Sequence, residues 1–336
     1  MIERPIAASA SPPFSILVVG LLCLAACVPD PGTVSPAVFD LKPPMVLEAG
    51  PVDEKSFVLR FDEDIAPVEG SFALSPGMAP WASAEGEELR LDLGEAQEAG
   101  RDYVISGEVR DERGNGSRFL LNFSGFNGHP AKLRISEVQT SKNSSLSRPH
   151  RDFVEFEVLE AGNLGGMEFT ATSSTKTTTW RFPGAAVARG EVVVLHCAPE
   201  GIPEERNETG GDLGLSGGID ATGGRDFWSK AGALPDSSGV LAIAEAPEGR
   251  PMDGVFYADG SKTGALGDAR LGTVVENLIE FGLWECAGVP AWEDAFVWKP
   301  SSSRSILRRG ASEPGAGEWT VSATSGQSPG RVDPLP

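Results

Sequence analysis

Short runs in which apolar and polar residues alternate recur from Phe57 almost to the end of the chain, and they constrain the fold more than any other feature. Successive side chains of a β-strand point to opposite faces, so this period indicates strands with one buried face. Turn residues, many of them glycine, separate the runs, and helical spacing is rare. We therefore predict a mainly β protein with two Ig-like antiparallel β-sandwich domains, the second carrying a helical insertion.

The first domain is predicted over residues 45–126. Its strands are expected at Phe57–Phe61, Ser71–Ser75 and Glu88–Leu93, and in a hairpin from Asp102 to Phe123 with its turn at Asp111–Gly116. The strand Phe57–Phe61 with Asp62 after it, and the later segment Tyr103–Asn115, resemble bacterial Ig-like domains of the S-layer and adhesin type. The resemblance implies a spacer or binding module without catalytic residues.

The second domain is predicted over residues 131–333. Strands are expected at Lys132–Val138, Arg151–Val158, Thr177–Phe182, Glu191–Cys197, Gly239–Glu245, Met252–Ala258, Ser301–Arg309, Gly317–Ser322 and Ser328–Asp333.

Several motifs of this domain resemble, in their order, the lamin-tail domain, an Ig-like sandwich. They are Ile135–Val138, Asp152–Phe156, Phe182–Gly184, Gly190–Val194, Ser305–Arg308, Trp319 and Ser328–Gly330. The resemblance implies a module that works through its surface. The segment Glu160–Phe169 only approximates the family pattern, and a long insertion lies at about residues 259–298.

The insertion contains a helical pattern, in which Leu271, Val274, Val275, Leu278 and Gly282 fall on one face. Trp284, Trp292 and Trp298 follow it. In one interpretation the helix covers an open end of the sandwich and these aromatic residues pack in its core. In the other they form a patch for a ligand or partner, because Trp is favoured at interface anchors.

The apolar segment from Phe14 to Ala26 is shorter than the about 20 residues of a membrane-spanning helix. It follows a weakly charged start and ends in small residues, which is the pattern of a signal peptide. Leu24–Cys27 resembles the lipobox of bacterial lipoproteins, which implies cleavage before Cys27 and lipidation of that residue. A plain secretory signal and a buried strand are the alternatives.

We therefore expect residues 1–26 to be a lipoprotein signal peptide and residues 27–44 a proline-rich tether. The expected location is the bacterial cell envelope, where the lipid holds the protein to a membrane. The residue after Cys27 is Val28, not the Asp that retains some lipoproteins at the inner membrane. This favours the outer membrane or cell surface.

Charge and cysteine content limit the partners and the covalent structure. The net charge of −20 disfavours nucleic acid, because it repels a phosphate backbone. Cys197 and Cys286 remain after Cys23 leaves with the signal peptide and Cys27 is lipidated. In an oxidising envelope they could form a disulfide, and two free thiols are the alternative.

Motifs with catalytic or metal-binding character have structural explanations. Gly214–Gly218 matches G-x-S-x-G around Ser216, but it lies in a glycine-rich loop, and His129, His150 and His196 all precede it, against the order of that fold. His129 and His150 lie beside prolines without metal-ligand spacing. No catalytic residue and no cofactor are expected.

Two groups of acidic residues have a functional alternative. Asp212, Asp220 and Asp226 could supply oxygen ligands to Ca²⁺, but their spacing is not that of an EF-hand, and acidic glycine-rich loops are usually solvated. Glu137 and Glu155 come from neighbouring predicted strands and could act as an acid and a base. We expect them to point outward or to bond backbone at the sheet edge.

The sequence thus predicts a non-enzymatic, lipid-anchored envelope or surface protein that presents binding or scaffolding modules. Its partner is expected to be a protein or polysaccharide of the envelope or exterior. The binding residues are expected near Phe227 and Trp228 and at Trp284 and Trp292. An envelope-associated hydrolase or metal-dependent enzyme subunit, and a purely structural spacer, are the alternatives.

Overall fold

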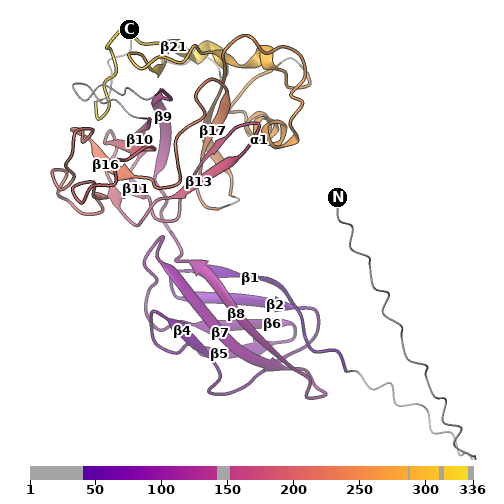
Figure 1. Cartoon of the computed structure of the whole chain (residues 1–336). Helices are drawn as coiled ribbons and strands as arrows, with labels where there is room; N and C mark the ends of the chain where they lie inside the picture. The colour runs from indigo at the N-terminus through magenta and orange to yellow at the C-terminus, as the bar shows by residue number, and fades with distance from the viewer. Residues whose placement is uncertain (1–40, 142–151, 248, 287, 310–313, 332–336) are drawn as a thin grey trace, which may run out of the picture. The chain divides into compact units, whose positions relative to one another are not determined.

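The computed structural model describes residues 41–141, 152–247, 249–286, 288–309 and 314–331 (Figure 1). The expected signal peptide, Cys27, most of the tether and His150 lie outside these residues. The chain separates into two units between Leu41 and Lys42, and the second unit holds all the strands and helices named below. The mainly β, sandwich-rich fold expected from the sequence is confirmed.

The first β-domain consists of two antiparallel sheets. One has the strand order β1-β2-β6-β5, with β1 at Val46–Asp53, β2 at Ser56–Phe61, β6 at Glu88–Asp92 and β5 at Trp81–Glu85. In the other, β7 at Asp102–Arg110 pairs with β3 at Ala66–Pro67, β4 at Ala73–Ser75 and β8 at Gly116–Ser124.

The alternation seen in the sequence decides which faces of these two sheets meet. Phe57, Leu59 and Phe61 of β2 are buried, and they share a core with residues such as Ile105 and Val109 of β7. The rings of Phe57 and Phe123 are 4.5 Å apart between centroids, so the two sheets pack face to face.

The second β-domain begins with a sheet in the order β16-β15-β10-β9-β20-β21. Its strands are β16 at Arg225–Trp228, β15 at Val192–His196, β10 at Phe153–Glu160, β9 at Lys132–Gln139, β20 at Ile306–Arg308 and β21 at Trp319–Val321.

A further sheet has the order β13-β12-β17-β18-β19. Its strands are β13 at Thr177–Arg181, β12 at Glu168–Thr172, β17 at Gly239–Ala244, β18 at Pro251–Ala258 and β19 at Phe296–Val297. A short pair joins β11 at Gly162–Asn163 to β14 at Ala186–Val187. The pairs β15–β16 and β18–β19 are parallel, so these two sheets are not wholly antiparallel.

Helix α1, Ala269–Glu280, covers part of the second sheet, and Figure 1 shows it beside β17. Its buried residues Leu271, Val275 and Leu278 belong to the core of the domain. The helix approaches β18 so closely that a Cβ atom at Gly254 would lie 2.7 Å from a methyl carbon of Leu278. The covering helix predicted from the spacing of the insertion is therefore present, and glycine at 254 allows it to pack.

The ends of α1 are fixed by local hydrogen bonds. The Asp268 carboxylate accepts the N–H groups of Arg270 and Leu271 at the N-terminus. At the C-terminus Gly282 adopts a φ of 68°, and the Leu283 N–H donates to the Leu278 carbonyl over 2.8 Å. The spacing in the sequence placed Gly282 on the apolar face of the helix. In the structure Gly282 lies just beyond the last helical turn and ends the helix.

A buried ion cluster joins the C-terminal strands to the rest of the second domain. The Arg308 guanidinium lies 2.6 Å from carboxylate oxygens of both Asp253 and Glu318, and its Nε donates to the Ile135 carbonyl. Burial raises the pKa of Asp253, although the charge of Arg308 acts in the opposite direction. The segment from Ser328 to Arg331 forms turns, so the strand predicted there is absent within the described part of the C-terminus.

Two short 3₁₀ helices, Trp292–Asp294 and Ala316–Glu318, complete the described secondary structure. No helix among the described residues has the length and apolar character needed to cross a membrane.

Candidate functional site

Phe227 and Trp228 lie on strand β16, not on a loop. The Phe227 side chain is fully buried, and its ring meets that of Phe182 edge to face at 5.3 Å. Trp228 is also buried and stacks on the ring of His196 at 4.0 Å. Because β16 pairs with β15 at the sheet edge, both aromatic residues serve the fold. This corrects the prediction that they contact a partner.

The tryptophans of the insertion are also largely internal. Trp284 is 1% exposed, and its Nε1 donates to the Asp294 carbonyl over 3.2 Å. Trp292 is half-buried, and Lys262 Nζ lies 4.2 Å from the centre of its ring. The prediction that Trp284 anchors a partner is corrected by this burial, and the alternative of core packing describes it.

A buried polar network holds the loop between β15 and β16, residues 198–224. His196 Nε2 lies 3.0 Å from Asp226 Oδ1. The other oxygen of Asp226 accepts the Thr222 N–H over 2.7 Å. These side chains connect the end of the loop to the two strands that carry it, so the loop is fixed where it returns to the sheet.

Glu208 and Arg225 fix the middle of the same loop. The Glu208 carboxylate is fully buried and accepts the N–H groups of Ser216 over 2.9 Å and of Asp226 over 2.8 Å. Arg225 donates to the carbonyls of Glu208 and Gly210, both over 2.6 Å, and pairs with Glu191. Buried charges that are this fully bonded are costly to break, so they restrain the loop at Glu208, Gly210 and Ser216.

The outer side of the loop exposes aliphatic side chains. Leu213 is 37% exposed, Leu215 is 41% exposed and Ile219 is 49% exposed. Acidic residues that are themselves exposed lie in the same loop, at Glu200, Glu204 and Asp212. Exposed apolar residues that form a contiguous patch can mark a contact with another molecule, so these three residues are the candidates for such a contact. We call Leu213, Leu215 and Ile219 the apolar loop surface.

Ser216 of the G-x-S-x-G match is part of this network, but not as a nucleophile. Its Oγ accepts the Trp228 Nε1–H over 2.8 Å, and the Trp228 ring, in turn, stacks on His196. A serine nucleophile needs a hydrogen bond to its base. The partner of Ser216 is an indole, which cannot accept a proton from it.

The three aspartates proposed for calcium have separate roles. Asp226 is buried in the network, whereas Asp212 is exposed and its carboxylate accepts the Gly214 N–H over 3.0 Å. Asp220 is partly buried. Within the described residues, no three His, Cys, Asp or Glu side chains gather in a way that could hold a metal ion.

Glu137 and Glu155 are opposite each other on β9 and β10, and both are buried. The N–H groups of Ser328 and Gly330 donate to Glu137 and Glu155, at 3.1 and 2.9 Å. Burial, followed by the nearby Glu137 charge, raises the pKa of Glu155 to about 8, against the Ser136 hydrogen bond. The pair thus fastens the C-terminal segment to the sheet through backbone N–H groups, which agrees with the expected bonding to backbone. The alternative that the two side chains point outward is wrong, because both are buried, and their strands lie inside the sheet and not at its edge.

The two cysteines are not joined in the structure. Cys197 is buried after β15, and burial raises the pKa of its thiol well above the ordinary value. Cys286 is partly exposed and its thiol donates to the Gly288 carbonyl over 3.3 Å. Both are free thiols, which was the alternative to the predicted disulfide.

Comparison with known proteins gives a family match for the second β-domain. The family described as TP_1001 protein second domain matches residues 131–321. A protein of Treponema pallidum (strain Nichols), whose printed name is "Uncharacterized protein", is 30% identical over 160 residues, which are 47% of this chain. The match spans 39% of the length of that relative.

Among solved structures, the chain resembles a DUF4876 family protein from Bacteroides thetaiotaomicron. The TM-score is 0.32 and the sequence identity 11%, with 81% of this chain and 93% of the other covered.

Proposed function

The chain belongs to the TP_1001 protein second-domain family, and for this member we propose a non-enzymatic role as a lipid-anchored envelope protein that binds another protein through the apolar loop surface. The observation that carries the proposal is the contrast within one loop. Buried charged groups at Glu208 and Arg225 hold it, while Leu213 and Leu215 are left in water. The stability of the fold does not require that leucines be exposed on a loop that is held by buried charged groups.

The chemistry of the loop indicates the kind of partner. Its exposed apolar residues are aliphatic, so they are suited to an apolar groove of a protein. The exposed acidic residues Glu200, Glu204 and Asp212 belong to the same loop, and Arg206 is its basic residue before Arg225. A groove with a basic rim is complementary to this surface and would be selected by charge.

The membrane anchor is supported by the lipobox-like segment that ends at Cys27. Lipid at this residue would leave both β-domains outside the bilayer, connected to it by the proline-rich tether. Replacing Cys27 by Ala should release the protein from the membrane fraction. If the variant stayed in that fraction, the lipid would not be the anchor.

Partner binding can be tested with a double substitution, Leu213→Ser with Leu215→Ser. Leu120 is 71% exposed on β8, so Leu120→Ser is a matched control that removes an exposed leucine elsewhere. Complexes extracted gently from membranes of the producing cells are compared by native electrophoresis. The wild type and the control should migrate with the partner and the double variant alone. Equal migration of all three would overturn the proposal.

A further inference from the structure

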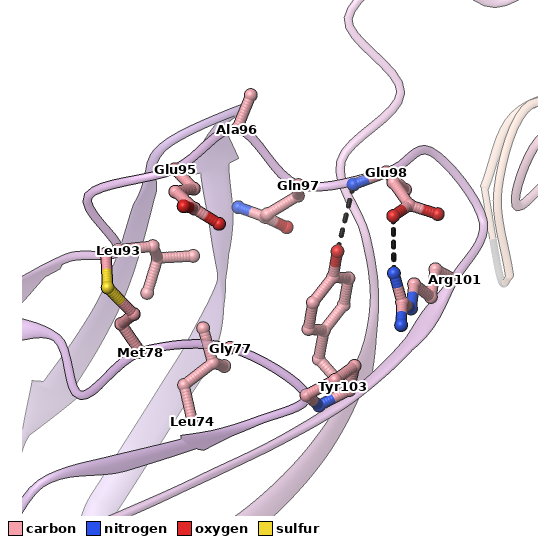
Figure 2. Close-up of a pocket in the computed structure, with 11 residues that line it drawn as sticks. Leu74, Gly77, Met78, Leu93, Glu95, Ala96, Gln97, Glu98, Arg101 and Tyr103 are labelled. Atoms are coloured by element: carbon pink, nitrogen blue, oxygen red, sulfur yellow. Dashed lines mark hydrogen bonds and ion pairs between the residues drawn. The ribbon is translucent and has the colours of Figure 1, made fainter.

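The first β-domain contains a pocket of about 240 Å³ that is separate from the apolar loop surface. It lies between the segment that follows β4 and the segment that connects β6 to β7 (Figure 2). Leu74 and Leu93 are buried in its wall, and Met78 is 59% exposed beside them. A pocket of this size accommodates a group as large as one side chain, not a whole drug-sized ligand.

Tyr103 forms a fixed aromatic side of the pocket. Its hydroxyl oxygen accepts the Glu98 N–H over 3.0 Å, and its ring stacks on Phe123 at 5.4 Å. The tyrosine therefore does not need to be ordered by a ligand, and binding would not incur that entropy cost.

The charged groups of the pocket are not equivalent. The Arg101 guanidinium is paired with the Glu98 carboxylate, and Gln97 bonds the backbone at Asp53 and Phe126. Glu95 forms no side-chain hydrogen bond or ion pair with any described residue. Figure 2 shows its carboxylate turned toward the same space as the side chains of Leu93 and Gln97. Glu95 is exposed, so it places one unpaired carboxylate at the rim of the pocket, next to the apolar side chains of the wall.

We propose that this pocket binds an alkylammonium group, either of a small amine or of a lysine side chain. The ammonium would pair with Glu95, and the aliphatic stem would lie against Leu74, Leu93 and Met78. A hydrogen bond between a carboxylate and a cation is stronger than one between two neutral groups. The net charge of −20 raises the concentration of cations near the surface. An anionic ligand is disfavoured, because the nearby arginine is already paired.

The test follows the Met78 methyl group by NMR in full-length protein labelled with ¹³C-methyl methionine. The chain has five methionines, and the loss of one signal in Met78→Leu assigns the reporter. The titrants are n-butylammonium, the neutral isostere n-butanol, and a Gly-Gly-Lys-Gly-Gly peptide with blocked ends. We expect a saturable shift with n-butylammonium, at least tenfold weaker binding in Glu95→Gln, and no change in Glu112→Gln, which removes an exposed carboxylate from a turn of the same domain.

The peptide distinguishes the two sources of the amine. Binding of the peptide as tight as that of n-butylammonium would identify lysine side chains of polypeptides, and binding of n-butylammonium alone would identify small amines. An equal shift with n-butanol, or unchanged binding in Glu95→Gln, would overturn the proposal. These outcomes are independent of the apolar loop surface, because that surface belongs to the other β-domain.

Discussion

Replacing Glu155 by Gln should remove most of the change in stability between about pH 5 and pH 8. The carboxyl is buried opposite Glu137, and its pKa is about 8 instead of the ordinary 4.5. The folded protein therefore holds this proton more tightly than the unfolded chain does. The contribution of this bound proton to the stability of the folded protein is fully present below the pKa of Glu155 in the unfolded chain, 4.5. It is lost as the pH rises through the pKa in the folded protein, about 8.

The size of the effect follows from the two pKa values of Glu155. Each pH unit between them corresponds to about 1.4 kcal/mol in the free energy of unfolding. The full interval gives an upper bound of about 5 kcal/mol, and relaxation around the charged pair should reduce this to a few kcal/mol. Gln retains the packing, since its carbonyl can accept the Gly330 N–H while its amide donates to the Ser136 hydroxyl.

The assay is urea unfolding, followed by tryptophan fluorescence at each pH across this range. Wild type and Glu155→Gln should be similar near pH 5, and the variant should be the more stable at pH 8. Glu157→Gln is the matched control, because Glu157 lies on the same strand and pairs with Arg134 at 2.6 Å. The control should keep the wild-type pH dependence. A wild-type stability that is flat from pH 5 to pH 8, or a Glu155→Gln variant that keeps the wild-type slope, would show that Glu155 is not the source of the pH dependence.

The remaining predictions concern the second β-domain. Trp284→Ala should lower the free energy of unfolding by about 3–5 kcal/mol, because it leaves a cavity in the core. A loss below about 1 kcal/mol, measured by urea titration, would show that Trp284 is not packed in the core. Arg308→Met should cost about 3–5 kcal/mol at neutral pH, since it leaves Asp253 buried without its cation, and the same titration measures it. In native protein a maleimide should label Cys286 and leave Cys197 unmodified until urea is added, and mass spectrometry that finds the two joined would contradict the free thiols.

The parts of the fold that the sequence predicted are those set by local patterns. The alternation in Phe57–Phe61 and the 3.6-residue spacing from Leu271 to Leu278 each describe one element that buries one face. The hairpin turn is local in the same way, because the Asp111 carboxylate accepts the N–H groups of Arg113 and Asn115 at its own turn. Such features need no knowledge of distant partners.

Strand β16 could not be predicted in this way. Its residues Arg225–Trp228 are all buried, so they show no alternation. The burial of Arg225 depends on Glu191 and on carbonyls of the loop, which reach it only when β15 and β16 lie side by side. The sequence marked Phe227 and Trp228 as prominent aromatic residues, but their burial is a consequence of that long-range pairing.

The candidate site was only partly foreseeable. The prediction that a loop near Phe227 is the contact region stays a prediction, and the structure changes which residues it involves. Leu213 and Leu215 stand in a glycine-rich segment without any periodicity, and nothing local distinguishes an exposed leucine from a buried one. The available signal was three aliphatic residues, Leu213, Leu215 and Ile219, in an acidic and glycine-rich segment that has no strand or helix in which to bury them.

In-cell cross-linking through residue 215 is the most direct test of the proposed contact surface. A photoreactive amino acid replaces Leu215 in one strain and Leu120 in another, and both strains are irradiated before lysis. We expect one discrete adduct of higher mass from position 215, retained by the membrane fraction, and none from position 120. Equal adducts from both positions, or none from position 215, would contradict the claim that the apolar loop surface binds a protein partner.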